Sequence, residues 1–233
     1  MLKRTLFGLT SLFFALSSHA NVVITGTRVI YPQEEKNISV KLENAGKNAA
    51  LVQAWIDDGD ANADPRNIKV PFVITPPVSR VEAKSGQTLR ITYTGTKALP
   101  TDRESLFYFN LLDIPPKPNK ELLEKSSNFL QLAIRSRLKF FYRPSNLSIT
   151  PNDAYNKVKW KATLNGIVVD NQTPYYLSYV GLELNKVAIK KANMVAPFSQ
   201  STFETKGVKK GAKVKWYLIN DYGGDVVGES ILE

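Results

Sequence analysis

Two residue types on which much of enzyme chemistry depends are missing from most of this sequence. Cysteine does not occur among the 233 residues, and the only histidine is His19, close to the N-terminus. Without cysteine the chain has no disulfide, no thiolate nucleophile and no cysteine-based metal site. If residues 1–20 are removed, the chain also loses histidine, the usual general base and a common transition-metal ligand. Most hydrolase mechanisms therefore lack a required group.

Apolar runs long enough to cross a membrane are also lacking. The N-terminal run at residues 6–16 falls short of the roughly 20 residues that span a bilayer. Lys3 and Arg4 precede it, and the small residues of a cleavage site follow, ending at Ala20. This order is typical of a secretory signal peptide. We therefore expect residues 1–20 to be a signal peptide cleaved after Ala20, and the mature chain to be exported and free of the membrane.

Acidic residues are outnumbered by basic ones, with 21 Asp and Glu against 31 Lys and Arg and a formal charge of +10. Loss of Lys3 and Arg4 with the signal peptide leaves +8. A basic surface attracts nucleic acid, anionic lipid or an acidic protein. Because the charges are dispersed and no nucleic-acid module occurs, we expect no nucleic-acid partner and interpret most of these charges as solvated surface.

Alternation of apolar and polar residues recurs along the chain and predicts half-buried strands. Turn-rich segments separate these runs at the intervals of a β-sandwich. The predicted helix at residues 117–128 is short and polar. We therefore predict an all-β fold. The clearest alternating sets are Ile38, Val40 and Leu42; Leu89, Ile91 and Tyr93; Val158, Trp160, Ala162 and Leu164; and Val214, Trp216 and Leu218.

The segment NFLQLAIRSRLKFFYRP, residues 128–144, continues this alternation for about fifteen residues, where a typical strand has roughly 5 to 6. Phe129, Ala133 and Phe141 add apolar residues to the second face, so this predicted strand needs two partners. Pro144 ends the pattern, because proline cannot continue a regular ladder. We predict a domain boundary there, with Ig-like sandwiches at residues 21–143 and 144–233. One apolar face carries Leu130, Leu132, Ile134, Leu138, Phe140 and Tyr142.

Charged residues near the predicted strands allow several interpretations. Arg28 and Lys139 fit solvent-exposed edge charges, or a clamp for a carboxylate or phosphate. Asp221 in LINDYGG fits a tight turn. The carboxylates of Glu104 and Asp221 could also suggest glycosidase chemistry, although sugar-binding features are missing.

Six segments resemble the periplasmic pilus-assembly chaperone family, the PapD-like chaperones of Gram-negative bacteria. They are TGTRVIYP, RESLFYFNLLDIPP, LQLAIRSRLKFFYRP, NQTPYYLS, MVAPFS and INDYGG, and together they cover the mature chain in order. The resemblance implies two Ig-like domains in an L or boomerang arrangement, no catalytic activity, no cofactor and a periplasmic location.

The resemblance also implies roles for particular residues. Arg28 and Lys139 match the pair that anchors the C-terminal carboxylate of a pilus subunit. Glu104, Arg143 and Asp221 match an interdomain ionic network. The apolar residues donated as a strand to the subunit are matched by Leu130, Leu132 and Ile134.

The partners that the resemblance implies are pilus subunits, including an adhesin, and an outer-membrane usher. The short connection at residues 115–128, which has no cysteine pair, matches the short-loop subgroup. An exposed apolar strand could also pair with its own copy, giving a self-capping homodimer. The alternative function is a secreted, basic Ig-like module that binds a polyanion or a cell-surface ligand.

Overall fold

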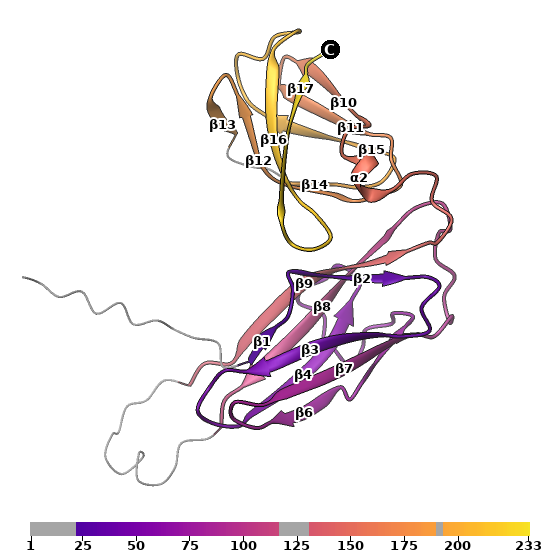
Figure 1. Cartoon of the computed structure of the whole chain (residues 1–233), viewed down its shortest axis with the longest axis vertical. Coiled ribbons are helices and arrows are strands. Elements are labelled where there is room, and N and C mark those ends of the chain that lie inside the picture. Colours follow the sequence, from indigo (N-terminus) through magenta and orange to yellow (C-terminus); the bar gives the residue numbers. More distant parts are fainter. Residues whose placement is uncertain (1–21, 117–130, 190–192) are drawn as a thin grey trace, which may run out of the picture.

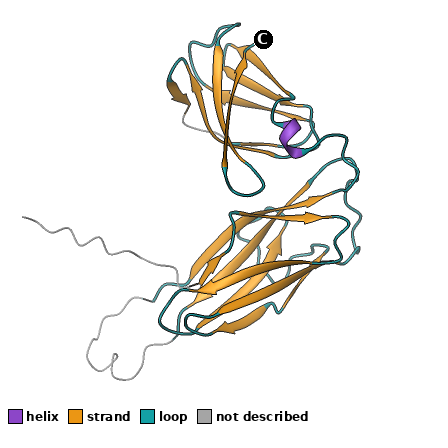
Figure 2. Ribbon diagram, in the orientation of Figure 1, coloured by secondary structure: helices purple, strands orange, loops and turns teal. Residues whose placement is uncertain are grey.

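The computed structural model describes residues 22–116, 131–189 and 193–233. These residues form two β-sandwiches and one short helix, so the predicted all-β class is correct (Figure 2). The predicted signal peptide, the predicted helix at 117–128 and Leu130 lie outside the described residues. None of the helices in the described part of the chain is long and apolar enough to cross a bilayer.

The first sandwich packs a four-stranded sheet against a five-stranded one (Figure 1). The four-stranded sheet has the order β1 (Val22–Ile24), β3 (Ile38–Asn44), β7 (Gly86–Tyr93) and β5 (Phe72–Thr75). The five-stranded sheet has the order β2 (Arg28–Pro32), β9 (Ile134–Arg143), β8 (Ser105–Ile114), β4 (Ala50–Asp57) and β6 (Val78–Val81). β2 and β9 run parallel, whereas the other neighbours are antiparallel.

The second sandwich is built in the same way from the C-terminal part of the chain. One sheet has the order β10 (Val158–Thr163), β11 (Gly166–Asn171) and β15 (Ser199–Glu204). The other has the order β13 (Val187–Ile189), β12 (Leu177–Leu184), β16 (Lys213–Ile219) and β17 (Asp225–Ile231), and β14 (Met194–Val195) also pairs with β12. Helix α2 (Pro151–Ala154) precedes β10 and is capped by Thr150.

Each sandwich has its own apolar core, which explains why the alternating pattern is visible in the sequence. Val40, Leu89 and Ile91 are buried in the first core, and Trp160 and Trp216 in the second. Fully burying one large apolar side chain contributes about 1.5 to 3 kcal/mol. The interleaved side chains of the two sheets therefore supply most of the stability of each domain.

One predicted buried row was wrong at its end. Leu164 was predicted to continue the buried row of β10, but it is fully exposed. The strand ends at Thr163, and Leu164 lies in the tight connection to β11, which starts at Gly166. Bends at residues 25–27 separate β1 from β2, so Arg28 is the first residue of β2.

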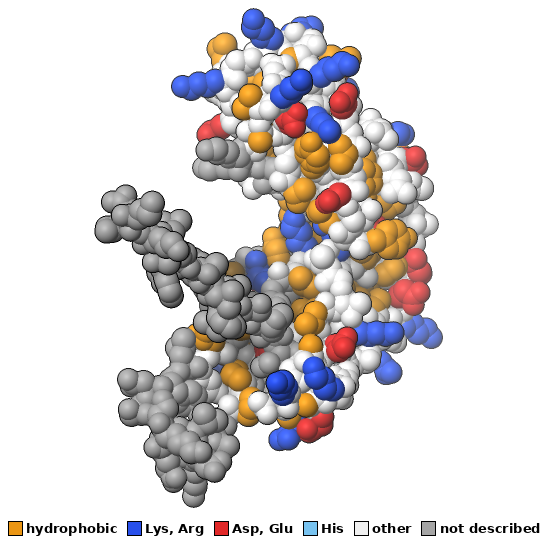
Figure 3. Space-filling view, turned by 60° about the vertical axis from the view of Figure 1, so that its left-hand side comes forward, with side chains coloured by type: hydrophobic (Ala, Val, Ile, Leu, Met, Phe, Trp, Pro, Cys, Tyr) orange, Lys and Arg blue, Asp and Glu red, His pale blue; other side chains and the backbone are white. Residues whose placement is uncertain are grey.

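The two sandwiches meet at an angle and form a bent molecule that is hollowed between them (Figures 1 and 3). The link after β9 is tied to the end of β2, because the Gln33 amide donates to the Arg143 carbonyl at 2.8 Å. The Ser145 hydroxyl also donates to the Glu34 carboxylate at 2.6 Å. These bonds hold the end of β9 and the start of the link against the segment that follows β2.

Candidate functional site

Strand β9 is paired over different lengths on its two edges. Its antiparallel pairing with β8 runs from Ile134 to Tyr142. Its parallel pairing with β2 begins only at Lys139, opposite Arg28, and ends at Arg143. Within the described residues, the edge of Ile134–Leu138 that faces away from β8 therefore has no strand neighbour. Backbone donors and acceptors on such an edge can pair with another chain.

Apolar side chains before and at the start of this open edge are accessible. Leu132 is 60% exposed and Ile134 is 36% exposed, whereas Phe140, on the same strand, is fully buried. Phe141 is buried on the opposite face, where its ring lies 5.6 Å from that of Tyr176 in the second domain. The C-terminal part of β9 is therefore packed on both faces, whereas Ile134 at its start is exposed.

The strand begins later than the sequence predicted. Alternation suggested a start near Asn128, but residues 131–133 are not part of the sheet and β9 starts at Ile134. β8 ends at Ile114, and two prolines follow directly, so residues 131–133 have no antiparallel partner among the described residues. The Gln131 side chain instead donates to the Pro115 carbonyl at 2.8 Å.

Arg28 and Lys139 lie side by side where the open edge of β9 meets β2. Both side chains reach the second domain. Arg28 Nη1 donates to the Ile219 carbonyl at 2.9 Å, and Lys139 Nζ donates to Ser178 Oγ at 2.9 Å. In the described part of the chain, neither cation forms an ion pair with a carboxylate.

The electrostatics of this pair favour an anion. Burial, and then the neighbouring Arg28 charge, lower the pKa of Lys139 below its ordinary value. Burial also lowers the pKa of Arg28, against the opposing effect of Asp221. The Arg28 Nε atom is buried without a hydrogen-bond acceptor among the described residues. A carboxylate or phosphate placed between the two cations would reduce their electrostatic repulsion and would accept hydrogen bonds from both side chains.

Arg143 connects the two domains a few residues further along β9. Its Nε donates to Glu104 at 2.8 Å, and its Nη1 and Nη2 donate to Asp221 at 2.7 and 2.9 Å. The second Glu104 oxygen accepts from the Tyr176 amide at 2.8 Å. Glu104 is buried in the first domain, and Asp221 lies in the loop between β16 and β17. One guanidinium therefore holds carboxylates from both sandwiches.

The sequence and fold match known proteins over nearly the whole described chain. Residues 21–148 match the family described as pili and flagellar-assembly chaperone, PapD N-terminal domain. Residues 153–230 match the family described as pili assembly chaperone PapD, C-terminal domain. The chain belongs to the PapD-like pilus-assembly chaperones.

Individual relatives agree with this family. The chaperone protein HifB of Haemophilus influenzae is 62% identical over 237 residues, which cover 100% of this chain and 98% of HifB. A solved structure of the Salmonella enterica SafA pilin in complex with the SafB chaperone matches with a TM-score of 0.78 and 28% identity, covering 91% of this chain and 96% of that one. The periplasmic chaperone SfaE matches with a TM-score of 0.70 and 32% identity, covering 91% of this chain and 100% of SfaE.

These matches confirm three predictions from the sequence. The chaperone has two Ig-like domains of the PapD type, it is a pilus-assembly chaperone, and its family is one of chaperones rather than enzymes. The glycosidase interpretation of Glu104 and Asp221 has no support, since both carboxylates are held by Arg143. Among the residues that the structure describes, no group of three or more His, Cys, Asp or Glu could hold a metal.

The structure adds residues that the sequence analysis of the chaperone missed. Ser178 holds Lys139, and Tyr176 contacts both Phe141 and Glu104. Tyr155 lines the same small hollow as Arg28, and burial raises its pKa to about 12. These residues reach the charged side chains of the site only because the two domains are in contact. A sequence pattern does not show that contact.

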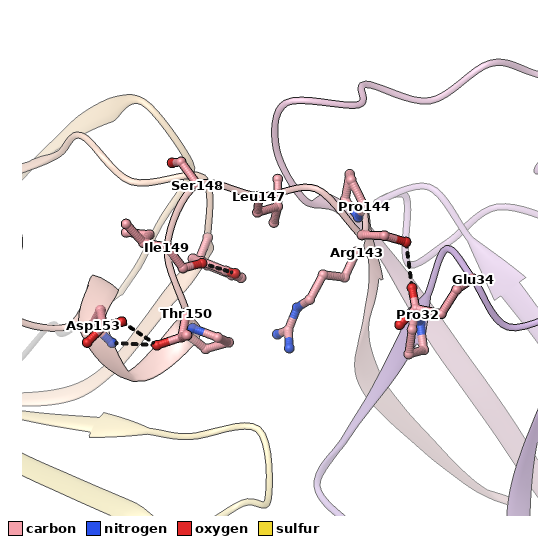
Figure 4. A pocket seen from close by; sticks show the side chains of 12 residues that line it. Pro32, Glu34, Arg143, Pro144, Leu147, Ser148, Ile149, Thr150 and Asp153 are labelled. Carbon is pink, nitrogen blue, oxygen red and sulfur yellow. Dashed lines mark hydrogen bonds between the residues drawn. The ribbon is translucent and has the colours of Figure 1, made fainter.

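A larger hollow of about 470 Å³ lies beside the link of the chaperone. Figure 4 shows the Arg143 side chain extending between Pro32 and Glu34 of the first domain and Ile149 and Thr150 of the second. The hollow follows the bend between the sandwiches and exposes the polar link to solvent. It therefore belongs to the joint that Arg143 holds.

Proposed function

We propose that this chaperone captures pilus subunits by adding β9 as a strand to the subunit and by anchoring the subunit's C-terminal carboxylate between Arg28 and Lys139. The observation that carries the proposal is the open edge of Ile134–Leu138, which leads directly to two half-buried cations without an ion-pair partner among the described residues. An extended peptide on this edge would gain backbone hydrogen bonds, and its terminal carboxylate would meet both cations.

The apolar side chains give the proposed interaction most of its energy. By family resemblance, Leu130, Leu132 and Ile134 fill pockets in a subunit that lacks one strand. Three buried aliphatic side chains contribute on the order of 5 to 9 kcal/mol before ordering costs. The exposure of Leu132 and Ile134 supports this role, since both can transfer into a groove. The anchor would set the register, because the carboxylate has one position between the cations.

The subunit class follows from the family. SafB is described in complex with a pilin, and we infer that this chain likewise binds pilins and tip adhesins of its own system. We further propose delivery of the bound subunit to an outer-membrane usher. The short connection at 115–128 supports the short-loop subgroup, which is associated with rod-like or adhesive pili.

Several organisational features complete the proposal. We propose a periplasmic location reached by export with a signal peptide cleaved after Ala20. We propose a domain boundary at Pro144, with the N-terminal domain at 21–143 and the C-terminal domain at 144–233. Glu104, Arg143 and Asp221 would act as the interdomain ionic network that sets the angle between these domains.

Co-expression with a groove-bearing pilin tests the proposal. Leu132→Asp should abolish subunit recovery and leave the chaperone folded, because a carboxylate cannot enter an apolar pocket. Leu164→Asp is the matched control, since Leu164 is exposed in a loop of the other domain. Equal recovery with both folded variants would refute strand donation. Recovery that depends on salt and not on Leu132 would favour the polyanion-binding alternative.

A further inference from the structure

An ion pair with a buried carboxylate ties the open half of β9 to β4, on the far side of β8. Asp57, the last residue of β4, is 1% exposed. Arg137 of β9 donates to it twice, from Nη2 to Oδ1 at 2.6 Å and from Nε to Oδ2 at 2.9 Å. β8 lies between these two strands, so the Arg137 side chain reaches across a whole strand to make this contact.

The remaining bonds of Asp57 are also satisfied. The Gly59 amide donates to Oδ1 at 2.8 Å, and the Asn110 side chain donates to Oδ2 at 2.7 Å. Each carboxylate oxygen thus accepts two bonds. Burial opposes ionisation of Asp57, but the bonds from Arg137 and Asn110 keep its pKa below the ordinary value. A carboxylate bonded in this way has one stable position, and so does the guanidinium that it holds.

Arg137 is fixed on its other face as well. Its guanidinium carbon lies 3.5 Å from the centre of the Tyr108 ring, and its Nη2 donates to the Gly59 carbonyl at 3.1 Å. Tyr108 is also the register partner of Lys139, the second member of the anchor. The neighbouring Arg135 lies over Trp55 of β4 at 5.7 Å. Both arginines of the open half are therefore directed across β8 and away from the free edge.

We propose that Asp57 is a positioning residue for strand donation. It holds Arg137 so that Ile134–Leu138 stays extended on β8 with its other edge clear of charged side chains, ready to pair with a subunit. This inference rests on the proposed function, and its observations are independent of the Arg28 and Lys139 anchor. The sequence gives no sign of it, because Asp57 begins the acidic, turn-like run DDGDANADP.

The position of Arg137 along β9 suits it to this role. Arg137 lies between Ile134, proposed to be donated to the subunit, and Lys139, proposed to anchor it. In this part of β9 the described residues supply only one strand neighbour, β8. Strands paired on one edge open more easily than strands paired on both. Holding Arg137 therefore compensates for the missing neighbour where the strand must remain ordered and free.

Hydrogen exchange measured by mass spectrometry on the free, full mature chaperone tests the positioning directly. In Asp57→Asn, amides of residues 134–138 should exchange about tenfold faster or more, while those of 140–142, which have strand neighbours on both sides, stay protected. Arg137→Lys keeps the charge but loses the bidentate hydrogen bonds to Asp57, so its amides at residues 134–138 should also exchange faster. If Asp57→Asn does not fold, Arg137→Lys provides the test. Asp170→Asn is the control, because Asp170 pairs with Lys161 in the second domain.

Capture of a pilin is measured on the same variants. Asp57→Asn should slow association about tenfold relative to wild type, because the free energy of ordering β9 must then be supplied during binding. Asp170→Asn should associate at the wild-type rate. Unchanged exchange and unchanged association in the folded variants would overturn the positioning role. If capture by wild type is itself independent of Leu132, strand donation fails, and the exchange result still decides whether Asp57 orders β9.

Discussion

Arg28 and Lys139 are register partners across the parallel pairing of β2 and β9, and each donates a hydrogen bond to the second domain. Register partners on neighbouring strands project from the same face. The two cations are thus brought together by strand pairing and held by contacts from the other sandwich. The proposed anchor therefore depends on the first domain for spacing and on the second for orientation.

Removal of either anchor cation should weaken subunit capture. We expect Arg28→Ala and Lys139→Ala each to cost about 2 to 5 kcal/mol of binding free energy, because the carboxylate would lose a desolvated partner. Titration of each variant with a purified pilin measures the change in Kd. Arg66→Ala is the control, since Arg66 forms an exposed ion pair with Asp64. A folded double variant with wild-type affinity would remove the anchor from the proposal.

The anchor also predicts a pH dependence of capture. The pKa of Lys139 in the free chaperone is lowered by burial and by Arg28, and a bound carboxylate would raise it. The complex then holds its proton more tightly than the free protein. Affinity should be greatest below the free pKa of Lys139 and should fall as pH rises through the pKa of the complex.

Affinities measured from neutral to alkaline pH test this dependence. Lys139→Arg keeps its charge over that range, so its affinity should vary less with pH than that of wild type. Parallel pH profiles of wild type and Lys139→Arg would contradict the linkage to this lysine.

Loss of the ionic network should loosen the joint between the domains. Glu104→Ala leaves Arg143 partly buried without one carboxylate, and we expect a loss of about 3 to 5 kcal/mol in unfolding free energy. Asp221→Ala should cost less, because Asp221 is more exposed, but should widen the range of interdomain angles. Small-angle scattering and denaturant unfolding measure the two effects. Asp225→Ala, in the same hairpin, should change neither.

Self-pairing through β9 gives a further prediction. The free edge and the exposed Leu132 should let two copies associate when no subunit is present. Sedimentation of wild type over a concentration series should show a dimer, and Leu132→Asp should remain monomeric. Identical behaviour of the two proteins would count against self-capping. Leu164→Asp controls for the added charge.

Acid should destabilise the protein partly through Asp57. Its pKa in the folded chain lies below the ordinary value of 3.8, so its contribution is present above that pH and lost as pH falls through the folded pKa. The unfolding midpoint in urea should drop less between pH 7 and acid in Asp57→Asn than in wild type. Asp58→Asn, at the exposed neighbouring position, should follow wild type.

Strand patterns in the sequence predicted most of the fold because they reflect burial directly. The rows containing Val40, Leu89, Trp160 and Val214 all face a core. Alternation failed where burial was not its cause: at Leu164, which lies in a turn, and at residues 131–133, which have no neighbouring strand in the part of the chain that the structure describes. An alternating pattern shows that two faces differ and does not show that a ladder partner is present.

The candidate site was predictable only in part. Resemblance to the family indicated five charged residues. In the structure Arg28 lies beside Lys139. Arg143 forms ion pairs with Glu104 and Asp221. The supporting residues were not predictable, because their effect depends on contacts between distant strands. Ser178 reaches Lys139 across the domain contact, and Asp57 reaches Arg137 across β8.

The place of Arg143 at the end of β9 has a mechanical consequence. The strand that carries Lys139 ends in the residue that binds both domains, only four positions away. A change in domain angle would therefore pull Ser178 and Ile219 away from the two cations that they hold. A ligand seated between those cations would resist the change. Affinity for that ligand and rigidity of the joint between the domains would then be coupled. A partner that changes the angle between the domains would weaken binding of the ligand.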